Sequence, residues 1–237
     1  MISTEFIHKY YPPEHYDGTQ KFYDWIRAGI NKDFTALNVG AGLTSERKLK
    51  SLKGEVRQVY GVDIDEDVLS NKDLDFSIHL KSDLLPFEDN FFDIAWSDYV
   101  LEHVKEPELF FKEIYRVLKP NSKFYFRTPN INHYVSIISR LTPHWFHLFI
   151  ANKFMSNLEE LHKSHVTYYR ANSKSSLIKY AKSIGFNKIK FILFESEPSY
   201  LLFSKPSFYL GLAYERVVNK FKCLESLRAN IFGCLTK

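Results

Sequence analysis

Cysteines and long apolar runs are scarce in this sequence of 237 residues. Its two cysteines, Cys223 and Cys234, have no other candidate ligands near them, which excludes a zinc site and a disulfide framework. A spanning helix needs about 20 apolar residues, and the nearest approach, Phe191–Leu212, is interrupted by three charged side chains. The N-terminal segment also lacks the basic and apolar regions of a secretory signal. We therefore expect a cytoplasmic protein that holds no metal and does not cross a membrane.

The two parts of the sequence differ in net charge. Residues 1–150 hold 18 Lys and Arg against 22 Asp and Glu, whereas residues 151–237 hold 14 against 6. The first part is therefore at −4 and the second at +8, within a total of +4. This asymmetry indicates either an acidic partner for the C-terminal part or a solvated basic face, and both interpretations stay open.

Short apolar runs alternate with helical segments in the first half of the chain. Near-continuous apolar character is typical of parallel strands that are covered on both faces. Five runs show it: Thr35–Val39, Val59–Asp63, Ser77–Leu80, Phe91–Ser97 and Lys123–Thr128. Between the last two, Pro107–Leu118 has the broad apolar face of a helix. Repetition of strand, helix and strand predicts an α/β fold with a doubly wound, mostly parallel sheet.

The pattern changes after the fifth run. Residues 130–170 are rich in His, Trp, Phe and Asn, and a structureless loop of this length is uncommon in a compact domain. We expect this segment to be a helical insertion that caps the acceptor side of a single domain spanning residues 1–237. A helix over Ser173–Gly185, a strand over Lys188–Phe194 and a short last strand over Tyr200–Phe203 are expected to follow.

Residues 205–237 are expected to form an amphipathic C-terminal extension. Within Tyr209–Leu227 apolar residues recur at helical spacing and basic residues lie close to them. The apolar set is Leu210, Ala213, Val217, Phe221 and Leu224, and the basic set is Arg216, Lys220 and Lys222. Such a helix can lie on an anionic membrane surface. It can equally dock on the protein's own core or on a second subunit, where Glu215 and Glu225 would dilute the positive charge.

A glycine-rich turn follows the first strand. Gly40 and Gly42 permit a tight turn and close backbone approach, and a helix opening at Thr44 or Ser45 would offer free N–H donors to a nucleotide. A dehydrogenase is a competing interpretation of this turn. Its fingerprint, however, requires Gly or Ala at position 45, where this chain has Ser45.

Two carboxylates are placed at the ends of the following strands. Asp63 ends the second strand and can accept hydrogen bonds from both ribose hydroxyls of an adenosine ligand. Asp83 comes after the third strand and can accept one from an adenine amino group. Because open α/β sheets bind ligands along the carboxyl ends of their strands, the spacing predicts a site for an adenosine-containing cofactor.

Four segments resemble consecutive motifs of the class I methyltransferases that use S-adenosylmethionine (SAM): NVGAG, GVDIDEDVL, SDLLPFEDNFFDIAWSDYVLEHV and LFFKEIYRVLKPNSKFYFRTPN. The likeness covers residues 35–130 and, more loosely, 165–186, and it is to small enzymes that act on quinones, lipids, sugars and other small molecules. It implies SAM as the cofactor. It also implies a Rossmann-like sheet of seven strands, of which the last runs antiparallel.

The same resemblance implies which residues contact SAM. The glycines would lie against its amino-acid part, Asp63 would hold the ribose, Asp83 with Leu84 would hold the adenine, and two residues after the fourth strand would line the site near the sulfonium. The full set is Asn38, Gly40, Ala41, Gly42, Asp63, Ile64, Asp83, Leu84, Ser97 and Tyr99. The chain departs from the family in having Asn38 for an acidic residue, Thr44 for a third glycine and Asn121-Ser122 for a pair of glycines.

A general base is harder to assign. Three histidines are candidates because each lies near the expected site: His103, His133 and His165. The acceptor is expected to be an oxygen or nitrogen of a small or glycan/lipid-linked molecule, with peripheral membrane contact through the C-terminal helix. A non-catalytic SAM-binding module or partner subunit is the alternative. A nucleic-acid substrate is less favoured, because Thr128–Asn130 lacks the aromatic residue of a base-flipping motif. The oligomeric state is left open.

Overall fold

The structure is a computed structural model, which describes residues 3–12, 17–141, 166–198 and 201–237. The chain divides into two compact units. The first, which we name the sheet unit, comprises Thr19–Thr128, Tyr168–Ile192 and Phe232–Lys237. The second, the helical unit, comprises Met1–Gly18, Pro129–Thr167 and Leu193–Ile231.

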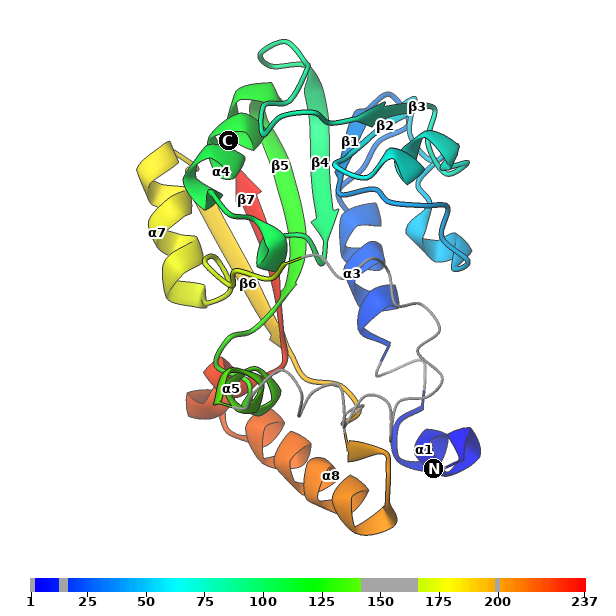
Figure 1. Cartoon of the computed structure of the whole chain (residues 1–237), viewed down its shortest axis with the longest axis vertical. Helices are drawn as coiled ribbons and strands as arrows, with labels where there is room; N and C mark the ends of the chain where they lie inside the picture. The colour runs from blue at the N-terminus through cyan, green and yellow to red at the C-terminus, as the bar shows by residue number, and fades with distance from the viewer. Residues whose placement is uncertain (1–2, 13–16, 142–165, 199–200) are drawn as a thin grey trace. The chain divides into compact units, whose positions relative to one another are not determined.

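A seven-stranded sheet with the strand order β3-β2-β1-β4-β5-β7-β6 organises the fold (Figure 1). Its strands are β1 (Thr35–Val39), β2 (Gln58–Asp63), β3 (Phe76–His79), β4 (Phe92–Asp98), β5 (Leu118–Pro129), β6 (Lys188–Phe194) and β7 (Asn230–Thr236). Strands β1 to β5 pair in parallel and β7 runs antiparallel. The predicted fold class is confirmed, including the direction of the last strand. The strand order reverses between β1 and β4, and open sheets bind ligands at such a switch point.

Helices alternate with the strands along the chain. The α-helices are α1 (Thr4–Tyr10), α3 (Gly18–Arg27), α4 (Pro107–Val117), α5 (Tyr134–Leu141), α7 (Lys174–Ile184) and α8 (Lys205–Lys220). Short 3-10 helices span Lys48–Lys50, Glu66–Ser70, Leu101–His103 and Lys222–Leu227. In the described part of the chain, no helix combines the length and the apolar character that crossing a bilayer demands.

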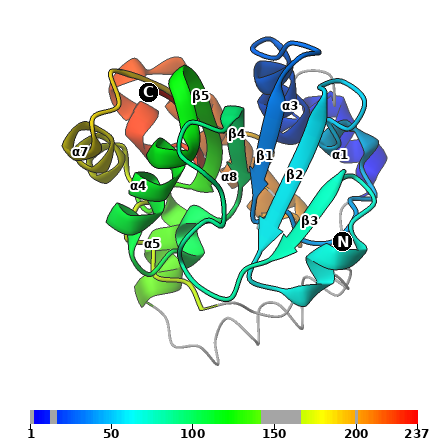
Figure 2. The ribbon, with the colours of Figure 1, turned by 90° about the horizontal axis from the view of Figure 1, so that it is seen from above.

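Helices cover the sheet from both sides (Figure 2). Successive side chains of β5 point to opposite faces, as in any strand. On one face Phe124 and Phe126 meet Phe111 of α4, and on the other Tyr125 meets Trp25 of α3. Both faces of the central strands are therefore buried, which explains why these strands appear in the sequence as continuous apolar runs rather than as alternating ones.

The prediction that a helix opens at Thr44 or Ser45 is wrong. Residues 41–47 form a loop, and only the 3-10 helix Lys48–Lys50 follows. In this loop the Ser45 amide donates to Asp73 Oδ2 at 2.9 Å, and Thr44 Oγ1 accepts from the Lys72 amide at 2.7 Å. These bonds between side chain and backbone offer the loop an alternative to the helical ladder.

The last strand was also predicted at the wrong place. Residues 201–203 form turns rather than a strand, and Ser204 then caps α8 by accepting from the Ser207 amide; Tyr200 lies outside the described residues. The last strand of the structure is β7, which lies within the predicted C-terminal extension. Its Gly233 hides the strand pattern, and a glycine is needed there because an added Cβ would overlap the ring of Phe126.

The predicted insertion is described in part. Helix α5 lies within it, and residues 142–165, including His165, lie outside the described part of the chain. The predicted C-terminal extension consists of α8, the 3-10 helix Lys222–Leu227 and β7. Only the first of these three is a long amphipathic helix.

Candidate functional site

The loop after β1 is shaped by two glycines in left-handed conformations. Gly40 has a φ of 75° and Gly42 a φ of 53°. The amides of Gly40 and Ala41 both donate to the Val62 carbonyl, at 2.8 and 3.1 Å, which closes the turn against β2. An added Cβ would overlap Val100 at Gly40 but would meet nothing within 4 Å at Gly42. The backbone at Gly42 is therefore uncovered, as the close approach of a ligand requires.

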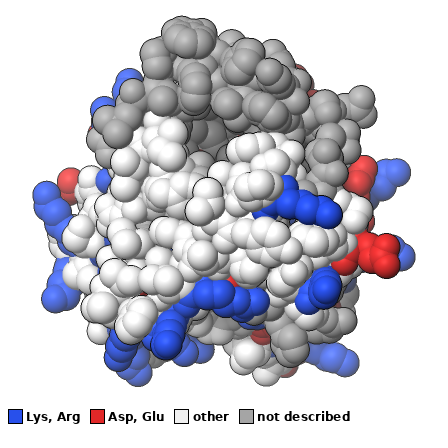
Figure 3. All heavy atoms as spheres, turned by 90° about the horizontal axis from the view of Figure 1, so that it is seen from below, with Lys and Arg blue, Asp and Glu red and all other residues white. Residues whose placement is uncertain are grey.

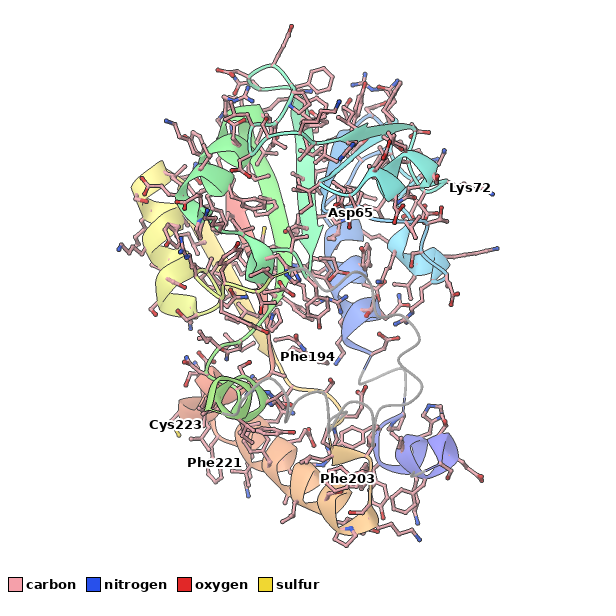
Figure 4. The ribbon with its side chains drawn as sticks, viewed as in Figure 1. Asp65, Lys72, Phe194, Phe203, Phe221 and Cys223 are labelled. Atoms are coloured by element: carbon pink, nitrogen blue, oxygen red, sulfur yellow. The ribbon has the colours of Figure 1, made fainter. Side chains whose placement is uncertain are left out.

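Asp63, the last residue of β2, is held in place by backbone amides. Its Oδ2 accepts from the Gly42 amide at 2.8 Å, and its Oδ1 accepts from the amide of Asp65 at 3.0 Å. Asp65, labelled in Figure 4, lies two positions after the last residue of the strand. Each carboxylate oxygen keeps a further lone pair, so Asp63 can still accept bonds from two hydroxyls. Ile64, beside it, is 60% exposed and offers an apolar surface.

The loop after β3 carries Asp83 and Leu84, and both side chains are exposed. Two residues of α4 fix the loop beyond them. Glu113 Oε2 accepts from the Leu85 amide at 2.9 Å, and Arg116 donates to the carbonyls of Leu85 and Phe87. The hydrogen bond from Arg116 lowers the pKa of Glu113, so this carboxyl stays ionised. Because α4 fixes the loop, Asp83 and Leu84 are presented at a defined position.

The end of β4 is fixed by a buried ion pair. Asp98 binds Arg127 through two hydrogen bonds of 2.6 and 2.7 Å, and Arg127 also donates to Thr19 Oγ1 at 3.0 Å. The guanidinium lies 4.5 Å from the centroid of the Tyr99 ring, and Tyr99 has a φ of 58°. Tyr99 is thus held in an uncommon backbone conformation with an exposed ring, whereas Ser97 is fully buried.

Glu102 is a second buried carboxyl after β4. Its Oε2 accepts from Thr128 Oγ1 at 3.2 Å, and Thr128 Oγ1 in turn accepts from Asn172 Nδ2 at 2.6 Å. Its carbonyl accepts from the amides of Tyr168 and Tyr169. Burial raises the pKa of Glu102 to about 7. This carboxyl therefore joins three segments of the sheet unit and changes its charge near neutral pH.

The candidate histidines lie in different surroundings. His103 ends the 3-10 helix after Glu102 and is half-buried in the sheet unit. His133 is buried in the helical unit, with its Nε2 3.5 Å from Glu195 Oε1. His165 lies outside the described residues. The structure therefore gives His103 the more accessible position of the two that it describes.

The carboxyl ends of β1 to β4 thus bring most of the predicted cofactor residues to one edge of the sheet. This edge offers an uncovered glycine backbone, a backbone-anchored carboxylate and exposed apolar side chains, and these groups fit an adenosine-type cofactor. Asn38 lies half-buried in β1, beside Trp96 of β4. In the described part of the chain, no three His, Cys, Asp or Glu side chains are grouped so that they could hold a metal ion.

Sequence reasoning missed Asp98, Glu102, Arg127 and Glu195. Arg127 is the one charged residue within FYFRT, the apolar part of β5, and only 3% of it is exposed. A lone arginine in a buried strand requires an acidic partner. That signal pointed to an ion pair but could not name Asp98, which lies 29 positions earlier in the chain.

Part of the chain matches a family of known proteins. Residues 37–126 match the methyltransferase domain family. No curated protein matches the chain. The family match thus marks a methyltransferase domain over residues that make up less than half of the chain.

Three solved structures share the fold. One is the Haemonchus contortus phosphoethanolamine N-methyltransferase 2 in complex with phosphomonomethylethanolamine and S-adenosylhomocysteine. Its sequence identity to this chain is 17% and the TM-score is 0.60. The match covers 94% of this chain and 53% of that one. The chain thus spans about half the length of that enzyme. The second is an Archaeoglobus fulgidus SAM-dependent methyltransferase, with 18% identity, a TM-score of 0.56 and 98% of each chain covered.

The third structure is a Haloferax volcanii protein in complex with the Trm112 methyltransferase activator. Its identity is 17% and its TM-score 0.59, with 93% of this chain and 90% of that one covered. At these identities the likeness shows a shared fold.

Proposed function

We propose that the chain transfers the methyl group of SAM to an oxygen or nitrogen atom of a small or glycan/lipid-linked acceptor. The observation that carries the methyl transfer is the edge of the sheet at β1 to β4, where Gly42, Asp63 and Asp83 follow three neighbouring strands in the order of the family motifs. A small acceptor is supported by a solved structure of the same fold. The Haemonchus contortus enzyme, which shares the fold, is bound to phosphomonomethylethanolamine, a small phosphate ester.

When bound, SAM supplies a methyl group that is already activated by the sulfonium. The chain therefore has to align the acceptor with that methyl group rather than to generate a leaving group. Gly42 would approach the amino-acid part with its backbone, Asp63 would accept bonds from the ribose hydroxyls, and Ile64 and Leu84 would cover the adenine. Tyr99, fixed by Arg127, would line the site near the sulfonium.

We propose His103 as the first candidate for a base that takes the acceptor's proton. It belongs to the sheet unit, as the cofactor residues do, and ends the 3-10 helix that follows β4. His133 is buried beside Glu195 and would have to leave that pair to reach an acceptor. Replacing His103 by Gln should lower kcat and remove the acidic limb of the pH–rate profile, while the Kd for SAM stays unchanged. His133→Gln is the comparison, and a His103→Gln enzyme with an unaltered profile would exclude His103 as the base.

Binding of SAM is tested by calorimetry on the full chain. We expect the wild type to bind SAM and S-adenosylhomocysteine, and Asp63→Ala to lose about 1–3 kcal/mol of binding free energy, because two ribose hydroxyls lose their acceptor. The matched control is Asp24→Ala, which removes an exposed carboxylate of α3. A wild-type protein that binds neither ligand at millimolar concentration would contradict the proposal.

Turnover separates the enzyme from the second candidate function, a non-catalytic SAM-binding subunit. One observation favours that candidate: the Haloferax volcanii protein of the same fold was solved in complex with an activator. Labelled SAM should be incubated with the chain and a panel of glycan-linked and lipid-linked acceptors. Transfer of label supports the enzyme. Intact SAM binding without transfer to any acceptor supports the subunit.

A further inference from the structure

Helix α8 in the helical unit has two unlike faces. Its inner face consists of buried residues, among them Phe208, Glu215 and Val218. Its outer face exposes apolar side chains instead, with Leu210 72% and Val217 45% exposed. The apolar stripe predicted from the sequence is thus a surface feature, and the alternative in which it docks on the protein's own core is wrong for these two residues.

Aromatic residues extend this apolar surface at both ends of α8. Phe203 and Phe221, labelled in Figure 4, flank the helix and are 40% and 48% exposed. Tyr209 is also exposed, and its hydroxyl lies 3.2 Å from that of Tyr10 in α1. Side chains with an apolar ring and a polar tip are favoured where one end is apolar and the other is wet, as at a membrane–water interface.

The outer face of α8 is basic as well as apolar. Lys205, Arg216 and Lys220 are exposed on it. The helix is described throughout, and its one carboxylate, Glu215, is 1% exposed and accepts bonds from Tyr11 and Asn219. Glu215 also pairs with Arg216, whose Nε lies 3.3 Å from Glu215 Oε2. The charge of Arg216 is therefore diluted, as expected from the sequence, whereas Lys205 and Lys220 keep the face basic. Seen from below, Figure 3 shows an area of residues other than Lys, Arg, Asp and Glu, with Lys and Arg at its lower and left edges and Asp and Glu at its right edge.

We propose that this face lies on an anionic lipid surface. The docking face is defined by six residues: Lys205, Tyr209, Leu210, Val217, Lys220 and Phe221. The positive charge of this face favours an anionic bilayer over a second copy of the chain. A second copy that used the same face would bring lysines against lysines, whereas an anionic bilayer offers opposite charge at its surface and an apolar interior beneath it. Contact with lipid would bring the chain to lipid-linked acceptors, and only this consequence rests on the proposed function. The lipid contact itself does not depend on methyl transfer.

The test is co-sedimentation of the full chain with two kinds of vesicle, phosphatidylcholine alone and phosphatidylcholine with phosphatidylglycerol. We expect binding to the anionic vesicles at low salt and its loss in high salt, because exposed charges are screened. The double variant Lys205→Gln/Lys220→Gln should bind about 25-fold more weakly, since each lysine near such a surface contributes about 1 kcal/mol, or fivefold. Leu210→Ser should weaken binding while leaving the salt dependence in place.

Matched control variants remove the same kinds of side chain from the sheet unit. Lys112→Gln/Lys179→Gln removes two exposed lysines from α4 and α7, and Leu69→Ser changes a leucine that is 55% exposed in the sheet unit. Both should bind vesicles like the wild type. Absence of binding to anionic vesicles, binding that ignores salt, or an equal loss in the controls would overturn the proposal. So would a dimer in sedimentation that Leu210→Ser dissociates. SAM calorimetry on every variant separates failure of this proposal from failure of the proposed function.

Discussion

The strand ends of the sheet unit and helix α8 of the helical unit differ in what their side chains do. At the strand ends, opposite charges are paired. Asp98 binds Arg127, and Glu113 with Arg116 fixes the loop after β3. In the helical unit, α8 instead turns Leu210 and Val217 outward. The first arrangement makes loops rigid at the strand ends, where a cofactor must meet fixed groups; the second leaves a surface that a partner can cover.

The largest expected effect tests the inward pairs of the sheet unit. Arg127→Met removes one partner of a nearly buried ion pair and leaves Asp98 as an uncompensated charge, which should cost about 3–5 kcal/mol of unfolding free energy. Urea unfolding at pH 7 measures it. The double variant Asp98→Asn/Arg127→Met should recover much of the loss, because no buried charge then remains. A single variant as stable as the wild type would show that the pair does not hold the end of β4.

The fold was predictable because it depends on local patterns. The five strands of the first half are continuous apolar runs, and α4 and α7 carry the periodicity and the terminal residues of helices, such as the left-handed Gly185 after α7. The glycine turn and Asp63 were found by their position directly after such runs. All of these features can be recognised within about a dozen neighbouring residues of the sequence.

What could not be predicted depends on partners that are distant in the sequence. The sequence around Glu102 does not show that this carboxyl is buried. Its partner Thr128 comes 26 positions later in the chain and itself accepts a hydrogen bond from Asn172. Strand β7 was hidden by Gly233, whose need for space comes from Phe126 of another strand. Likewise, the spacing of Leu210 and Val217 showed that they share one face of a helix but not whether that face is covered.

A smaller effect should come from Glu102. Its pKa in the folded chain is about 7, above the ordinary value of about 4.3 in the unfolded chain. Between these values the folded chain binds a proton that the unfolded chain lacks. Stability due to this group should therefore be full at low pH and be lost as pH rises through about 7.

Glu102→Gln tests this sign, because its amide keeps hydrogen-bonding capacity and cannot ionise. From pH 5 to pH 8 its stability relative to the wild type should rise by an amount on the order of 2–3 kcal/mol. Urea unfolding at four pH values measures the difference. The matched control, Glu108→Gln on the exposed side of α4, should run parallel to the wild type at every pH. A Glu102→Gln curve that also stays parallel would contradict a raised pKa.

The two glycines of the loop after β1, Gly40 and Gly42, should differ in the reason why each is needed. Alanine at either position incurs the cost of a left-handed backbone, about 1–2 kcal/mol. At Gly40 the new methyl also overlaps Val100, which should add about 1–3 kcal/mol. Gly42→Ala should be the more stable variant and yet bind SAM more weakly, since its methyl stands where the ligand approaches. Thermal unfolding and calorimetry measure the two effects, and equal SAM affinity in Gly42→Ala and the wild type would place the ligand elsewhere.

The smallest expected effect belongs to the outer face of α8. Leu210→Ala should change the unfolding free energy by no more than about 0.5 kcal/mol, because an exposed side chain leaves no cavity. Phe208→Ala, on the inner face of the same helix, should cost about 3–5 kcal/mol. Urea unfolding of both variants at pH 7 measures the contrast. If Leu210→Ala were as costly as Phe208→Ala, the outer face would be part of a core rather than a surface. A leucine that stability does not require, and whose loss weakens vesicle binding, would be retained for contact with a partner.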